Sequence, residues 1–106
     1  MDAESLKGHL DLMLLASLKA EPLHGYGIVQ RVRLLSHGAF DLPEGTIYPA
    51  LHRLERRGLL CSGWQTAAGR RRRVYDLTPD GERALGERRE AWQRFAAGVS
   101  AVLDGS

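Results

Sequence analysis

The chain has 106 residues, of which 43% are hydrophobic and 26% are charged, so we expect one globular domain rather than a disordered segment. No apolar run approaches the roughly 20 residues that a membrane-spanning helix needs, and no signal peptide opens the chain. Cys61 is the single cysteine, which excludes an intrachain disulfide and, with the other two absences, favours a reducing cytoplasm as the location.

The net charge of +2 hides an uneven distribution. Seven arginines and two glutamates lie between Glu44 and Tyr75, a local charge of +5 that leaves −3 for the rest of the chain. A cationic patch of this kind is typical of a nucleic-acid-binding surface. The plainer alternative is a solvated basic surface without a partner.

Residues 10–18 predict a first helix that is apolar on nearly all sides, interrupted only by Asp11 and Ser17. Such a helix is buried on more than one side, and part of it is expected to face a partner subunit. Leu12 and Leu15 are the candidate dimerisation residues here. Pro22 ends the helix, because the residue before a proline avoids the α conformation.

A second helix is expected from about residue 24 to residue 35. The glycines on either side of Tyr26 match neither the phosphate-binding loop nor the dinucleotide fingerprint, so we interpret Gly25 and Gly27 as positions where this helix starts close against a neighbour. Tyr26 either belongs to that packing or reaches a DNA phosphate.

The third predicted helix, near residues 46–57, has two distinct faces at about 100° per residue. Thr46 is the expected N-cap, which places Pro49 at the third helical position, where no internal donor is lost. The first turn would enter a major groove while arginines meet the backbone. The predicted buried stripe is Ile47, Ala50, Leu51 and Leu54; the predicted outward face is Thr46, Pro49, His52, Arg53 and Arg56, with Tyr48 at its margin.

A hairpin is predicted from strands at residues 59–66 and 74–77. Between them lie a glycine turn and four consecutive arginines, Arg70, Arg71, Arg72 and Arg73. Adjacent like charges repel one another, so a fold tolerates them best where a polyanion lies, and arginines are drawn into narrow minor grooves.

Thr78 followed by Pro79 predicts the start of a last helix that runs to about Leu103. Its apolar residues recur at three- and four-residue steps, and a domain of this size has too little core to cover them. Pairing with a second copy is the natural solution. The candidate dimerisation residues on this helix are Leu85, Trp92, Phe95, Val99 and Leu103.

Three segments in order, 22–28 (PLHGYGI), 45–55 (GTIYPALHRLE) and 71–81 (RRRVYDLTPDG), resemble the PadR family of bacterial transcription regulators. The single C-terminal helix is similar to the short subtype of that family. The resemblance implies a mainly α fold with a small β-hairpin (α+β), a winged helix-turn-helix over residues 1–77 and a dimerisation helix over residues 78–106, which together form one compact unit. It also implies a homodimeric repressor that binds a palindromic operator and is released by a small effector, with an aromatic compound as one option.

By position, the resemblance places the recognition helix at residues 46–57, the wing at residues 69–73, and Thr46, Tyr48, Pro49, His52 and Arg53 in the groove. An aromatic residue of the last helix holds flat ligands in some short members, and Trp92 occupies the matching position. Dimer packing is the alternative role of Trp92. Gly27 and Glu44 depart from the usual family pattern at the starts of the second and third helices.

Other classes of function are less well supported by the sequence. The four histidines are scattered without a second ligand at metal-binding spacing, and no serine lies in a nucleophile elbow, so we expect neither catalysis, nor a metal, nor a cofactor. The alternatives are a winged helix that contacts proteins and a metal-responsive winged helix. The expected partners are double-stranded DNA, a second copy of the chain and a small effector, without a membrane.

Overall fold

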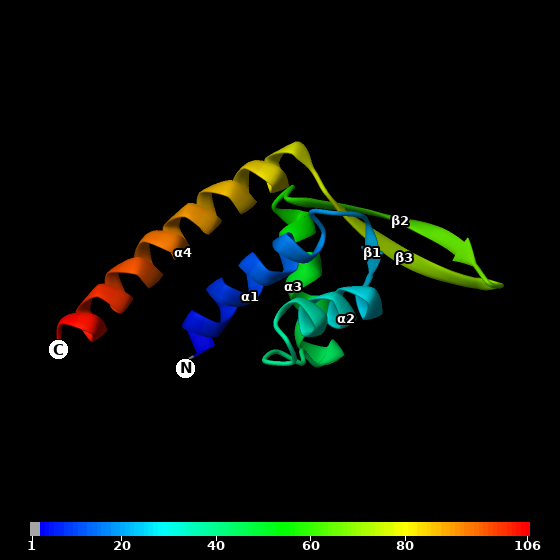
Figure 1. Ribbon diagram of the computed structural model, residues 1–106. Helices are drawn as coiled ribbons and strands as arrows, with labels where there is room; N and C mark the ends of the chain where they lie inside the picture. The colour runs from blue at the N-terminus through cyan, green and yellow to red at the C-terminus, as the bar shows by residue number, and fades with distance from the viewer. Residues whose placement is uncertain (1–2) are drawn as a thin grey trace.

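The computed structural model describes residues 3–106, which form four helices and a three-stranded antiparallel sheet (Figure 1). The hairpin of β2 and β3 extends to one side of the helices, and α4 runs past α1 toward the other side (Figure 1). This is the α+β winged helix-turn-helix with a long C-terminal helix that the sequence predicts. The elements in order are α1 (Ala3–Ser17), β1 (Leu23–His24), α2 (Gly25–Leu35), α3 (Glu44–Arg56), β2 (Leu60–Ala67), β3 (Arg70–Leu77) and α4 (Pro79–Gly105).

The core lies where α1, α2 and α3 meet, and it is closed by one residue from β3, Tyr75, and one from α4, Leu85. Leu15 is 0% exposed and Leu85 is 3% exposed, so both fill the core of a single protomer. Their predicted role in dimerisation is therefore wrong, because neither side chain reaches the surface. The other core residues are Leu10, Leu14, Leu18, Ile28, Val29, Val32, Leu42, Ile47, Ala50, Leu51, Leu54 and Leu60.

Helix α3 begins three residues earlier than the sequence predicts, with Pro43 in place of Thr46 as its N-cap. Pro43 is extended (φ −71°, ψ 145°), and its carbonyl accepts the amides of Thr46 and Ile47 at 2.9 and 3.2 Å. Thr46 therefore lies inside the first turn instead of capping it, and Glu44 supplies the negative charge that favours a helix start. Pro49 becomes the sixth residue of α3, where its missing N–H removes one internal hydrogen bond.

The hairpin is longer and its turn is tighter than predicted. Only Ala68 and Gly69 connect the strands, both at positive φ (52° and 75°), as a two-residue hairpin turn requires. The four arginines consequently lie in β3, paired with β2, and not in the turn. The short strand β1, which the sequence did not predict, pairs with β3 through Leu23 opposite Tyr75 and His24 opposite Val74.

Helix α4 is fixed at its start, as the threonine–proline pair predicts. The Thr78 hydroxyl accepts the Gly81 amide at 3.0 Å and donates to the Gly58 carbonyl at 2.6 Å. Gly81 packs so closely on the Leu59 carbonyl that a Cβ there would overlap it. The first turn of α4 is therefore held against the segment that connects α3 to β2.

Candidate nucleic-acid interface

One face of α3 is open to solvent. Pro49, His52 and Arg56 are exposed, Tyr48 is 37% exposed at the margin, and Thr46 is half-buried in the first turn. On the opposite face, the predicted stripe of Ile47, Ala50, Leu51 and Leu54 is at most 1% exposed, which confirms that part of the angular prediction. The open face is small and polar at the helix start and cationic at its end.

Arg53 is the exception on this helix. Its guanidinium forms an ion pair with Asp11 of α1, and the side chain is only 21% exposed. Because Arg53 lies three residues after the buried Ala50, it sits on the flank of the buried stripe, from which a long side chain reaches α1. The prediction that Arg53 faces outward is therefore wrong.

The Tyr48 side chain of α3 lies against Gly25, the first residue of α2. A Cβ on Gly25 would lie 2.5 Å from the Tyr48 hydroxyl and 2.6 Å from the ring carbon that bears it. The predicted close start of α2 against a neighbour is confirmed at this glycine. Tyr26, the next residue, is 52% exposed and points away from the core. The absence of a side chain at Gly25 thus allows Tyr48 to lie across the start of α2.

The wing has two chemically different faces, because successive strand residues point to opposite sides. Arg71 and Arg73 share one face with Trp64, which pairs directly with Arg73 across the strands. Their guanidinium carbons lie 5.0 and 5.5 Å from the centre of the Trp64 ring, within the range of cation–π attraction. Arg70 and Arg72 belong to the opposite face by the same alternation.

Arg72 is held by the first strand. Its guanidinium donates to Nε2 of His24 at 2.7 Å. Burial, and next the positive charge of Arg72, lower the pKa of the His24 imidazole. A neutral His24 accepts this hydrogen bond, whereas a protonated ring repels Arg72 and has no acceptor nitrogen.

The wing also contacts α3. Glu55 of α3 accepts a hydrogen bond from the Ser62 hydroxyl and lies 3.7 Å from the guanidinium of Arg73. Tyr75 is buried behind this contact, and burial raises the pKa of its phenol. Because of these contacts, α3 and the Arg71 face of the wing are parts of one surface.

An open cavity of about 620 Å³ lies between α2, α3 and the wing, and arginines from both faces of β3 line it. Apart from Gly25, its walls are aromatic rings, imidazoles and guanidinium groups, which suit phosphate oxygens and base edges. Of the predicted DNA-binding residues, the cavity brings together Tyr26, Tyr48, His52, Arg70, Arg71, Arg72 and Arg73, and it adds His24, Trp64 and Tyr75. Thr46, Pro49 and Arg56 lie elsewhere on α3.

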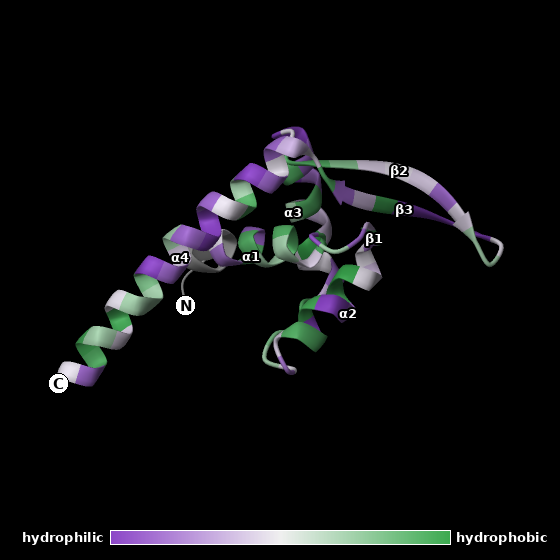
Figure 2. Cartoon of the chain, turned by 45° about the horizontal axis from the view of Figure 1, so that its top comes forward, coloured by the Kyte–Doolittle hydropathy of each residue, from purple (hydrophilic) through white to green (hydrophobic). Residues whose placement is uncertain are grey.

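The second half of α4 carries an apolar stripe that is largely exposed to solvent. We call Trp92, Phe95, Val99, Val102 and Leu103 the distal stripe; these side chains are 43%, 62%, 43%, 74% and 66% exposed. Hydrophobic colour recurs along this half of the helix in Figure 2. Four of the predicted dimerisation residues thus lie on one exposed surface.

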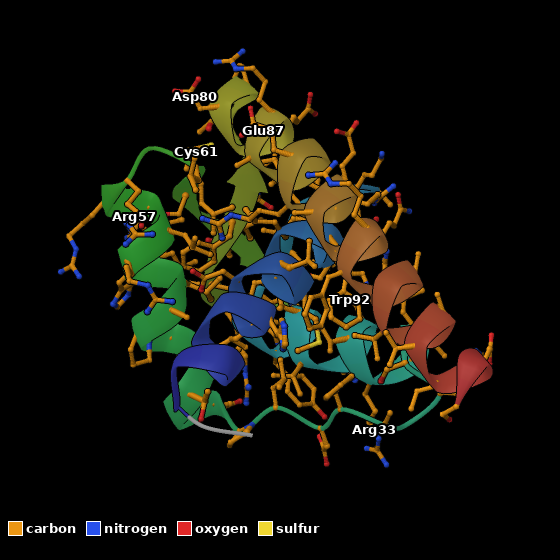
Figure 3. All side chains as sticks on the ribbon, turned by 90° about the vertical axis from the view of Figure 1, so that its left-hand side faces the viewer. Arg33, Arg57, Cys61, Asp80, Glu87 and Trp92 are labelled. Carbon is orange, nitrogen blue, oxygen red and sulfur yellow. The ribbon has the colours of Figure 1, made fainter. Side chains whose placement is uncertain are left out.

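Trp92 lies at the inner end of the distal stripe, on the side of α4 that faces α1 (Figure 3). Its ring meets that of His9 edge-on, with centroids 5.2 Å apart, and lies 6.0 Å from the Phe95 ring. Leu12, the remaining predicted dimerisation residue, is half-buried on α1. Either a stacked ligand or a second copy of the chain would cover the open side of this aromatic cluster.

A second apolar surface lies between α1 and α2. It is a groove of about 250 Å³ whose walls include Met13, Ala16, Val32, Leu35 and Phe40. Leu35 is 62% exposed and Phe40 is 41% exposed. Each protomer therefore offers both an uncovered apolar helix and an apolar groove.

The part of the chain that the structure describes contains no group of three or more His, Cys, Asp and Glu side chains that could hold a metal ion. None of the helices within residues 3–106 combines the length and the apolar character needed to cross a membrane.

The sequence prediction missed Trp64, His24 and Tyr75 of this surface, and it missed Asp11, which supports α3 from behind. The roles of Trp64 and His24 depend on the strand register, which the turn at Ala68–Gly69 determines. Alternation along Arg70–Arg73, counted from that turn, was the available signal. Asp11 was visible as the charge in an apolar helix, but nothing in the sequence indicated its partners.

Comparisons with known proteins agree with this geometry. A family model described as "Transcriptional regulator PadR-like family" matches residues 14–87. The chain is 44% identical over 77 residues to the transcriptional regulator Rv3488 of Mycobacterium tuberculosis, which covers 73% of this chain and 69% of that protein. Among solved structures, a PadR family transcriptional regulator from Eggerthella lenta has a TM-score of 0.80 at 34% identity, covering 97% of this chain and 88% of that one. A PadR-like transcriptional regulator from Bacillus cereus has a TM-score of 0.84 at 28% identity, covering 98% of this chain and all of that one.

Proposed function

This chain belongs to the PadR-like family of transcriptional regulators, and we propose that it acts in the cytoplasm as a homodimeric repressor that binds a palindromic operator and is released by a small effector. The family consists of DNA-binding regulators of transcription and not of enzymes. In this proposal, residues 1–77 bind DNA and residues 78–106 form the contact between the two copies.

The observation that carries the DNA-binding proposal is the shared surface of α3 and the wing. The open face of α3 presents Pro49 and His52, with Arg56 at its end, in the arrangement of a helix whose first turns enter a major groove. Trp64 holds Arg71 and Arg73 on the side of the wing that adjoins α3. We infer that α3 reads base edges while the wing arginines bind phosphates or the adjacent minor groove.

The homodimer is supported by the two uncovered apolar surfaces. A two-fold arrangement lets the distal stripe of each copy pack against the α1 side of the other, where the groove beside Met13 and Phe40 is open. The two-fold axis then creates two equivalent contacts, so that both apolar surfaces are covered in each copy. Two recognition helices about 34 Å apart would match half-sites separated by one turn of DNA.

The effector proposal rests on the aromatic cluster of His9, Trp92 and Phe95. In a dimer its open side would face the partner, where a flat aromatic compound stacks on Trp92 or the partner's side chains fill the space. A compound bound there would change the distance between the two copies, and with it the spacing of the recognition helices. Dimer packing alone is the second role that this geometry supports for Trp92.

The test is recovery of genomic fragments bound by the purified protein, followed by titration of the best fragment and of a scrambled duplex. We expect a clear preference for the recovered fragment and a steep loss of affinity as salt rises. Equal affinity for both duplexes would refute the repressor proposal.

A matched pair of variants tests the wing. Arg71→Ala removes a phosphate contact on the α3 side, so we expect weaker binding to both duplexes and a salt slope smaller by about 1. Arg72→Ala removes an arginine that alternation places on the opposite side of β3 and whose guanidinium reaches the cavity only where it is engaged by His24, so we expect a smaller loss. Equal losses would contradict the assignment of the two faces.

A further inference from the structure

Asp11 is a carboxylate inside an otherwise apolar helix. The residue is 4% exposed, and its neighbours along α1 include Leu10, Leu14 and Leu15, all in the core. A charge in this position is costly unless it is paired. Its partners come from two other helices, Arg53 from α3 and Arg88 from α4.

The two arginines share the carboxylate by using different oxygens. Arg53 engages Oδ1, and the Arg88 guanidinium lies 3.6 Å from Oδ2. The side chains of Arg53 and Arg88 are 21% and 33% exposed, so solvent replaces neither pair easily. The Nε atom of Arg53 is buried and has no hydrogen-bond partner among the described residues, which leaves Asp11 as the anchor of this arginine.

We propose that Asp11 is a positioning residue that couples the C-terminal helix to the recognition helix through these two ion pairs. The inference rests on the proposed function and deepens it, because it names the contact by which a change at the dimer interface reaches the DNA-reading helix. One carboxylate serves two cations, so displacement of Arg88 changes the hold on Arg53. Arg53 lies between His52 and the core residue Leu54. Its ion pair with Asp11 therefore determines how α3 packs against α1.

Arg88 is well placed to report movements of α4. It lies one helical turn before Trp92, on the same side of the helix, since residues four apart are neighbours on a helix surface. The distal stripe begins at Trp92, so any partner or compound that packs there acts on the helix one turn away from Arg88. At 3.6 Å, the Arg88–Asp11 pair is near the outer limit of an ion pair, and a small shift of α4 breaks or tightens it.

The experiment compares Arg88→Gln with Arg89→Gln. Arg89 is the adjacent residue on α4 and is exposed, so both variants lose one positive charge and keep a good helix former. The measured quantity is the ratio of affinities for the best recovered fragment and its scrambled duplex. We expect Arg88→Gln to lower this ratio at least fivefold, within the usual range of coupling between sites. Its affinity for the scrambled duplex and its salt slope should equal those of Arg89→Gln.

A double-mutant cycle identifies the carboxylate. In an Asp11→Asn background, Arg88→Gln should have no further effect on the ratio, because the contact is already lost. Thermal unfolding shows which variants are folded. If Asp11→Asn does not fold, the variant Arg88→Lys is used instead. Lysine retains the positive charge on a smaller head group, so the affinity ratio of Arg88→Lys should lie between those of Arg88→Gln and the unmodified protein.

Equal ratios for Arg88→Gln and Arg89→Gln would overturn the proposal. A loss of affinity for both duplexes beyond that of Arg89→Gln would also overturn it, since Arg88 would then be a direct phosphate contact. If the unmodified protein shows no preference, the repressor proposal fails, and hydrogen exchange of the free protein still decides the coupling. Faster exchange of amides in α3 with Arg88→Gln, but not with Arg89→Gln, is expected, whereas a change confined to α4 would refute it.

Discussion

Replacement of Leu103 by alanine tests the proposed homodimer at the exposed end of α4. Leu103 is 66% exposed in the protomer, and it lies in the distal stripe, which would be covered by a second copy. Complete burial of a leucine side chain stabilises by about 1.5–3 kcal/mol, so burial of its exposed part contributes about 1–2 kcal/mol. Two-fold symmetry applies this change twice, giving about 2–4 kcal/mol for the dimer.

That free energy corresponds to a rise in the dimer dissociation constant of about 30-fold to nearly 1000-fold, at tenfold for each 1.4 kcal/mol. Alanine retains the β-carbon of the leucine and so part of the buried surface, and we therefore expect an increase of at least tenfold. Sedimentation equilibrium over a dilution series measures the constant directly. If the protomer is stable only as a dimer, the same loss appears as a stronger dependence of the melting temperature on protein concentration.

The matched control is Gln93→Ala, on the same helix but outside the distal stripe. Gln93 is exposed, and its replacement removes a side chain of similar length without uncovering apolar surface. An unchanged dissociation constant for Leu103→Ala would refute the role of the distal stripe. Equal increases for the two variants would attribute the loss to the helix as a whole.

Two further predictions concern the start of α2. Gly25→Ala should lower the free energy of unfolding by about 1–3 kcal/mol, because the new methyl group meets Tyr48; Gly27→Ala, whose Cβ would find its nearest atoms at 3.4 Å, should be neutral or more stable by up to about 1 kcal/mol. Chemical denaturation compares the two, and the reasoning fails if Gly25→Ala remains equally destabilising in a Tyr48→Ala background. Burial and Arg72 lower the pKa of His24, so the folded state binds the proton less readily than the unfolded state, and stability is full above about pH 6.5 and declines as the pH falls below it. Unfolding measured at pH 8 and pH 5.5 should show a smaller decline for His24→Gln than for the unmodified protein, and identical declines would exclude His24 as the source.

Local patterns predicted the helices and their faces well, because they depend on neighbours in the sequence. The spacing of Ile47, Leu51 and Leu54 along a helix predicted the buried stripe of α3, and the Thr78–Pro79 pair predicted the start of α4. The start of α3 was predicted too far along the chain. The carbonyl of the extended Pro43 accepts the first helical amides, so the helix does not begin with Thr46 as its cap.

The errors in the candidate site arose where contacts between distant residues decide. Leu15 and Leu85 fit a stripe pattern equally well as core or as interface, and only the packing of the helices around the common core buries them. The sequence predicts that Arg53 is a surface arginine, because it does not show that Asp11 is buried beside it. The four wing arginines formed one charge cluster in the sequence, and the strand register divides them between two faces.

The fixed start of α4 has a mechanical consequence. The helix is 27 residues long, about 40 Å; Thr78 and Gly81 hold its first turn and the buried Leu85 holds its second. If α4 pivots as a rigid rod near Gly81, Arg88 lies about 10 Å and Leu103 about 33 Å from the pivot. A displacement of about 3 Å at the tip then moves Arg88 by about 1 Å. With such a pivot the helix would act as a reducing lever, and a displacement at its far end would reach the Asp11 contact at roughly a third of its size.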